Sequence, residues 1–274
     1  MFSVLNSFVI LLADRIDLAW IFLLFLIRFS VAFSLLPGLG GVLSAATRMP
    51  AILVFAATSA MSAGPTTAPT SWAVLLCMAL SEAIVGLILG FIPALLVAGF
   101  QLAGSLSSTS MGLGTAHLFD PSLGTSVSEL SKLYGDVAIL IFLGVGGHHT
   151  LIFLASGLAS QLPPGSFVMT SDLVTTLAQA STSIFSIGIA ASAPIIVALL
   201  LTQFVLGLLS KSIPTINLFI MSFPLTVGVG LTIGALALPS LGTYITEQVH
   251  LFDTLATNIL VAGPPTSKHQ PKDS

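Results

Sequence analysis

Hydrophobic residues dominate six long stretches of the chain, and short clusters of glycine, proline, serine and threonine separate them. The stretches lie near residues 18–36, 42–63, 72–103, 136–160, 180–209 and 217–242. Each is long enough for an α-helix to cross an apolar layer of about 30 Å, which takes about 20 residues. Backbone polar groups in such a layer must be satisfied within the segment, so we expect helices throughout. The pattern therefore predicts an all-α, polytopic membrane-type protein with about six long apolar helices.

Glycines and prolines inside these stretches indicate helices that bend and pack closely against other helices. Gly86 and Gly90 are four residues apart, as are Gly230 and Gly234, so each pair lies on one helix face. Small residues at this spacing let two helix backbones approach each other. We therefore assign Gly86 and Gly90 to helix packing and assembly, with the ordinary glycine usage of membrane helices as the alternative.

The last part of the chain differs from the rest. A mildly amphipathic helix is predicted for Thr243–Leu260, and a polar segment follows Gly263-Pro264-Pro265. We expect a single membrane domain over residues 1–260 and a disordered polar tail over 261–274. At the other end, Met1–Ala13 lacks a basic start and a cleavage site, so we expect it to be retained.

Composition supports the membrane assignment. Charged residues make up 6% of the 274 positions and the mean hydropathy is +1.08, whereas soluble domains carry about 25% charged residues. A soluble globular enzyme is excluded by these values, and seven Lys and Arg against ten Asp and Glu leave no basic surface for nucleic acid. The six predicted spans place three Lys or Arg on each side, so the positive-inside rule does not fix the orientation.

Glu82 is the acidic residue placed well inside an apolar stretch. A carboxylate there must face a protein interior or a wet cavity, because its desolvation is expensive. Two interpretations are open, an ion or proton site and a structural partner for a buried cation. Arg28, ten residues into the first stretch, is a candidate for that partner.

The segment 104–126 is too polar and too rich in glycine for a span, yet it is almost uncharged. Single apolar residues such as Met111 and Phe119 interrupt its serines, threonines and glycines. We expect a loop that lines or stops a pore, with a flexible surface loop as the alternative.

No catalytic, cofactor or metal site is predicted. His148 and His149 are adjacent and point about 100° apart on a helix, so they do not chelate one ion as an i, i+4 pair does. Glu247 and His250 have the spacing of di-iron bundles, but the apolar stretches supply one further carboxylate, Glu82. The chain has no P-loop before Lys132 or Lys211 and no activated nucleophile.

Several separated motifs agree with one family. They are Glu82-x-x-x-Gly86-x-x-x-Gly90, Gly104, Asp120-Pro121, Gly146-Gly147-His148 followed by Ser156 and Pro164, and the run Leu206–Phe219 with Pro224. Arg28, Pro37 and Arg48 fit as well. In order and spacing the chain resembles the FliR family, the membrane component of the flagellar type III export gate, which is related to the T-subunits of injectisomes.

The most specific piece of the resemblance is a signature turn made by Lys211, Pro214 and Asn217. The family typically has Arg-x-x-Pro-Gln-x-Asn there, whereas this chain has lysine for arginine and Thr215 for glutamine. Lysine does not reproduce the planar fork of arginine, on which a bidentate contact depends.

The resemblance implies a non-enzymatic subunit of the bacterial inner membrane and flagellar basal body. Its partners would be FliP-like, FliQ-like, FlhB-like and FlhA-like proteins, and its transient substrates the unfolded rod, hook and filament subunits. Glu82, Gly86, Gly90, Gly146, Gly147 and His148 would serve packing and assembly. The segment 105–122 would be the channel plug, with these residues: Ser105, Leu106, Met111, Gly112, Leu113, Gly114, Phe119, Asp120 and Pro121.

Three alternatives remain open. One is an injectisome T-subunit rather than a flagellar one. Another is a secondary transporter for a small solute, although the internal inverted repeat expected of that class is not visible. The last is a purely structural membrane scaffold.

Overall fold

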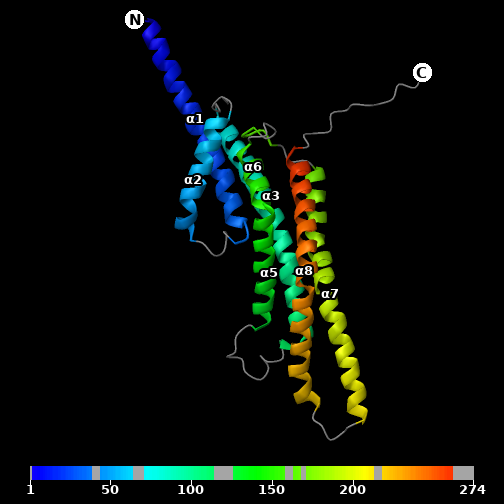
Figure 1. Ribbon diagram of the computed structural model, residues 1–274. Coiled ribbons are helices and arrows are strands. Elements are labelled where there is room, and N and C mark those ends of the chain that lie inside the picture. Colours follow the sequence, from blue (N-terminus) through cyan, green and yellow to red (C-terminus); the bar gives the residue numbers. More distant parts are fainter. Residues whose placement is uncertain are drawn as a thin grey trace, which may run out of the picture. The chain divides into compact units, whose positions relative to one another are not determined.

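The chain folds into long α-helices, as the hydrophobic pattern predicts (Figure 1). The structure is a computed structural model that describes residues 2–38, 44–63, 71–113, 126–157, 163–167, 171–212 and 218–261. The helices are α1 (Phe2–Leu35), α2 (Ala45–Ser62), α3 (Trp72–Ser110), α5 (Ser126–Val145), α6 (Gly147–Ser156), α7 (Ser171–Ser212) and α8 (Leu218–Val261).

Four of the described helices contain segments long and apolar enough to cross a membrane. The segments are Leu18–Leu35, Trp72–Ser110, Val174–Lys211 and Ser222–Phe252. A fifth results if α5 and α6 are counted as one broken span. The predicted class, a polytopic helical membrane-type protein, is confirmed, with α2 not among the candidate spans.

Helix boundaries differ from the sequence pattern at several points. Helices α1, α5 and α7 begin at Phe2, Ser126 and Ser171, ahead of the predicted starts at 18, 136 and 180. Helix α3 continues seven residues beyond the predicted end at residue 103, and α8 runs through Gly242 into the segment predicted as a separate amphipathic helix. Between α5 and α6 the predicted continuous stretch 136–160 is broken at Gly146. That glycine has φ of +87°, in the left-handed region that interrupts a helix and that glycine tolerates.

Two compact units make up the chain. Unit 1 comprises Met1–Ala94, Gly146–Leu177 and Leu251–Ser274, and unit 2 comprises Leu95–Val145 and Ala178–His250. Helices α3, α7 and α8 contribute to both. The polar tail expected over 261–274 lies, apart from Val261, outside the described residues.

Helices α1 and α2 lie side by side in unit 1 (Figure 1). Phe29 of α1 stacks on Phe55 of α2 with ring centroids 5.7 Å apart, and Phe33 lies 5.8 Å from Phe55. The first part of α3 adds Val85, Ile88 and Leu89 to the buried core. This apolar packing belongs to the same unit as the charged pair described below.

Unit 2 contains the end of α3 with α5, α7 and α8. Phe100 of α3 packs edge-on against Tyr244 of α8, with ring centroids 6.0 Å apart. Helix α5 approaches α3 closely at Gly104, where a Cβ atom would lie 2.7 Å from the carbonyl oxygen of Leu130. The hydroxyl of Ser131 donates to the carbonyl of Gln101 at 2.7 Å and fixes the same contact.

Candidate functional site

A buried ion pair joins Arg28 of α1 to Glu82 of α3 in unit 1. The arginine Nε donates to Glu82 Oε2 at 2.5 Å, and both side chains are fully buried. The other carboxylate oxygen accepts from the backbone N–H of Gly165 at 2.6 Å. Arg28 Nη1 donates to the carbonyl of Ala155, near the end of α6, at 3.1 Å. Four segments distant in sequence therefore meet at one pair of charges.

This geometry supports the structural interpretation of Glu82 over an ion or proton site. Both carboxylate oxygens already accept hydrogen bonds from the protein, and the opposing cation is in direct contact. The guanidinium also lies over the ring of Phe25, with Cζ 5.0 Å from the centroid. Arg28 Nη2 is the part of the cluster left without a hydrogen-bond partner among the described residues.

Gly86 and Gly90 form the face of α3 that touches α1. A Cβ atom at Gly86 would collide with the carbonyl oxygen of Arg28. At Gly90 it would lie 2.6 Å from the Cβ of Leu35 and 2.8 Å from the carbonyl oxygen of Ala32. The glycine pair singled out by its spacing thus lies against a helix of the same chain.

Gly146, Gly147 and His148 lie at the break between α5 and α6. Gly147 is buried and His148 is half-buried, with the rings of His148 and His149 4.0 Å apart between centroids. The Nδ1 atom of His148 is buried and has no hydrogen-bond partner in the part of the chain that is described. Within that part, no three His, Cys, Asp or Glu side chains gather as metal ligands would.

The first residues of the proposed plug segment are helical, which corrects the expectation of a loop from residue 104. Ser105 and Leu106 belong to α3, which ends at Ser110, and the backbone N–H groups of Met111 and Gly112 donate back to the carbonyls of Ser107 and Thr109 in its last turn. The serines do not break the helix because their hydroxyls donate back to its own carbonyls. Ser107 bonds Ala103 at 2.8 Å and Ser110 bonds Leu106 at 2.8 Å.

Met111 anchors the end of α3 to α8 within unit 2. Its side chain is buried and lies against Gly230, where a Cβ atom would come within 2.5 Å of the methionine Cε. Its carbonyl accepts a hydrogen bond from the hydroxyl of Thr226 at 3.1 Å. Thr226 was missed by sequence reasoning, although it lies one helical turn before Gly230 on the same face.

The other predicted site residues are less informative. Lys211 is exposed at the end of α7. Gly112 has φ of +82°, where the chain leaves α3. The remaining candidates lie outside the described residues: Gly114, Phe119, Asp120, Pro121, Pro214 and Asn217.

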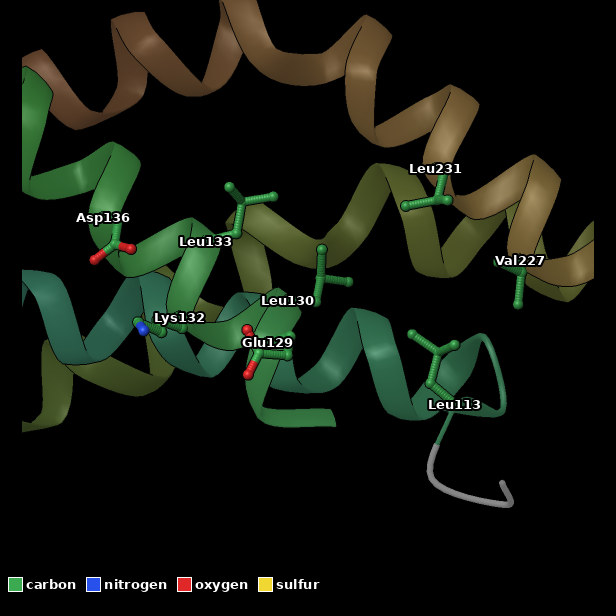
Figure 2. A pocket seen from close by; sticks show the side chains of 8 residues that line it. All are labelled: Leu113, Glu129, Leu130, Lys132, Leu133, Asp136, Val227 and Leu231. Carbon is green, nitrogen blue, oxygen red and sulfur yellow. The ribbon is translucent and has the colours of Figure 1, made fainter. Parts of the chain in front are cut away.

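A cleft in unit 2 was not anticipated from the sequence. It has a volume of 490 Å³ and lies between the first turns of α5, the first third of α8 and Leu113. Figure 2 shows leucine and valine side chains from both helices around it, together with three charged side chains of α5. Those charged residues, Glu129, Lys132 and Asp136, have the i, i+3, i+7 spacing of one helix face, a signal that the sequence did carry.

Comparison with known proteins identifies the family to which the chain belongs. The sequence profile of the family described as "Bacterial export proteins, family 1" matches residues 19–252. The chain therefore belongs to this family of bacterial export proteins. The matched range contains the buried ion pair, the glycine contact, the end of α3 and the cleft.

Individual members of the export family agree with this assignment. The flagellar biosynthetic protein FliR of Escherichia coli (strain K12) is 31% identical over 180 residues, which cover 66% of this chain and 68% of the relative. FliR of Pectobacterium carotovorum is 32% identical over 65% of this chain and 68% of its own length. FliR of Bacillus subtilis (strain 168) is 29% identical over 56% and 60%, respectively.

Proposed function

We propose that this chain is a non-enzymatic core subunit of the flagellar type III export gate in the bacterial inner membrane. It would help to form the channel through which unfolded rod, hook and filament subunits leave the cell. The observation that carries the proposal is the match of residues 19–252 to the bacterial export family, with FliR proteins as its similar members.

The length of α7 supports a role inside an assembly. Its apolar segment Val174–Lys211 has 38 residues, which at 1.5 Å per residue is about 57 Å. The hydrocarbon core of a bilayer is about 30 Å thick, so roughly half of this segment extends beyond it. Exposed apolar side chains nevertheless run along its whole length, from Val174 through Phe185 to Leu209. Apolar surface outside the lipid needs a protein partner to exclude water.

The expected partners are FliP-like and FliQ-like membrane subunits, with FlhB-like and FlhA-like proteins around them. Close backbone contacts such as that of Gly86 and Gly90 with α1 make unit 1 a compact element of such an assembly. The signature turn at Lys211, Pro214 and Asn217 is proposed to contact the assembly or the FlhB-like protein.

The segment 105–122 is proposed to be the channel plug, with its helical part up to Met111 as the fixed base and the residues after it as the blocking part. An idle gate must stop ions and still yield to an unfolded chain, which favours blocking by small and apolar side chains. The anchoring of Met111 by Thr226 and Gly230 supports this proposal, because a plug needs one fixed end. Helix α5 follows from Ser126 and provides the other end.

A secretion assay tests the proposed function. Cells lacking this chain are expected to release no hook or filament subunits into the medium, and a plasmid-borne copy should restore release. Co-purification of the chain with FliP-like and FliQ-like subunits separates an export gate from a solute transporter. Normal secretion in the deletion strain would contradict the proposal.

A further inference from the structure

The cleft of unit 2 combines an open apolar lining with a line of charges. Leu133 of α5 and Leu231 of α8 are 55% and 53% exposed, although both line the same 490 Å³ hollow. Leu113, Leu130 and Val227 complete the apolar wall (Figure 2). A hollow of this size takes side chains from one face of a helix and not a whole helix.

The charges are concentrated at this cleft. Unit 2 has five charged residues with described side chains, and three of them, Glu129, Lys132 and Asp136, line it. All three are exposed, and none forms an ion pair with a described residue. The formal net charge of these three side chains is −1, with an acidic residue at each end of the row and the lysine between them.

This pattern favours a protein over lipid as the occupant. Hydrocarbon tails would cover the leucines but would leave two carboxylates unpaired against an apolar medium, which is expensive. A partner helix that carries arginine or lysine beside its apolar residues covers the leucines of the cleft and pairs with its carboxylates at the same time. Complementary charges of this kind fix the register and suppress wrong partners.

We propose that this cleft is a docking site for an apolar helix of another membrane subunit, with an arginine or lysine facing Glu129 and Asp136. The proposal rests on the proposed function in one respect, because it takes the partner from the same export apparatus. The leucines accept the apolar face of the partner helix, and its cation neutralises the excess negative charge of the cleft.

Photocrosslinking in intact cells tests the proposal. Benzoylphenylalanine is placed at Leu133 or Leu231 of the full chain, and the adduct is mapped by mass spectrometry. We expect an adduct with a membrane subunit of the apparatus, within one helical turn of an arginine or lysine. The double reversal Glu129→Lys/Asp136→Lys should reduce its yield about tenfold or more. The neutral pair Glu129→Gln/Asp136→Asn should reduce it less.

Glu247→Lys is the matched control, since Glu247 is an exposed acid of unit 2 on α8 outside the cleft. It should leave the adduct unchanged, and chain abundance in the membrane should be equal in all variants. An adduct with lipid, with a second copy of this chain, with an exported subunit or with an uncharged segment would overturn the proposal. Equal yields from the reversal and the wild type would do so as well. If the wild-type chain forms no adduct with a membrane subunit while secretion is intact, the docking proposal fails and the proposed function still stands.

Discussion

At the scale of single residues, the pair Arg28 and Glu82 shows how a charge is kept inside an apolar bundle. Every oxygen of the carboxylate has a donor, and the guanidinium has a carboxylate, a carbonyl and an aromatic ring around it. Removing one partner leaves an uncompensated buried charge, whereas removing both leaves an apolar core. Replacing one member of the pair should therefore lower the free energy of unfolding much more than replacing both.

We predict that Arg28→Met destabilises the chain by about 3–5 kcal/mol, the usual cost of breaking a buried pair. The double variant Arg28→Met/Glu82→Leu should recover most of that loss. Thermal melting of the purified export complex measures both. Arg48→Met is the control, because Arg48 is half-buried and its Nη1 bonds only a carbonyl, that of Phe33 at 3.3 Å. A double variant as unstable as the single one would show that the charges themselves are needed.

The residues of this pair could be named from the sequence, because a charge in a long apolar stretch is conspicuous. The other hydrogen-bond partners of the pair could not be named from the sequence. Gly165 and Ala155 act through backbone atoms, and a backbone N–H or carbonyl has no sequence signal. Thr226 was missed for a related reason, since one threonine in a helix rich in threonine and serine is not distinctive until the fold brings it to Met111.

At the scale of elements, glycine faces set how closely helices pack. The collisions at Gly86 and Gly90 involve the backbone of α1, which cannot move without shifting the helix. At Gly230 the nearest atoms belong to the flexible side chain of Met111, which can adjust. Glycines with equal spacing in sequence are thus not equally sensitive to substitution.

We predict that Gly86→Ala and Gly90→Ala each destabilise the chain by about 1–3 kcal/mol, the usual cost of overpacking. Gly144→Ala is the matched control on α5, where a Cβ atom would meet nothing within 4 Å. It should be neutral or stabilise the helix by up to about 1 kcal/mol. Folded chain in the membrane fraction and the melting temperature of the complex measure these effects. Equal membrane levels and equal melting temperatures for Gly86→Ala, Gly90→Ala and Gly144→Ala would contradict a special role of the glycine face.

Helix type and approximate position followed from the hydrophobic pattern, but helix ends did not. The sequence Gly104 to Ser110 has the composition of a loop, yet it remains helical because its buried face packs in unit 2, while the serine hydroxyls are satisfied by carbonyls of the preceding turn. The glycine at 242 likewise leaves α8 intact, and Thr246 donates to its carbonyl at 3.0 Å. Tertiary packing overrides such local preferences.

At the scale of the whole molecule, exposed apolar surface points to dependence on other subunits. The end of α7 shows this most clearly, where Phe204, Val205 and Leu208 are each more than half exposed. A helix that is apolar around much of its circumference is stable when other helices or lipid cover it. Binding to the folded state stabilises a protein by mass action.

We predict that the chain is degraded several times faster in cells that lack the FliP-like and FliQ-like subunits than in cells that contain them. A pulse-chase measurement of its half-life in the two strains checks this. Phe204→Ser should shorten the half-life in the complete strain, while Ser210→Ala, at an exposed site on the same helix, should not. A long-lived, monodisperse monomer in the absence of partners would contradict an obligate assembly.

The last prediction concerns ion leakage through the assembled gate. A plug between the anchored end of α3 and the start of α5 can be shortened without touching Met111, whose buried contacts with Thr226 and Gly230 hold that helix end. Deleting residues 115–122 should therefore leave assembly intact and raise the passive ion conductance of the membrane severalfold, with secretion retained at least in part. A potential-sensitive dye in whole cells measures the leak, and blue-native electrophoresis confirms that the complex is present. Deletion of residues 65–69 is the control because that segment also joins two consecutive helices, α2 and α3, and lies outside the proposed plug. Wild-type leakage from an assembled complex lacking 115–122 would show that the barrier to ions lies elsewhere in the apparatus.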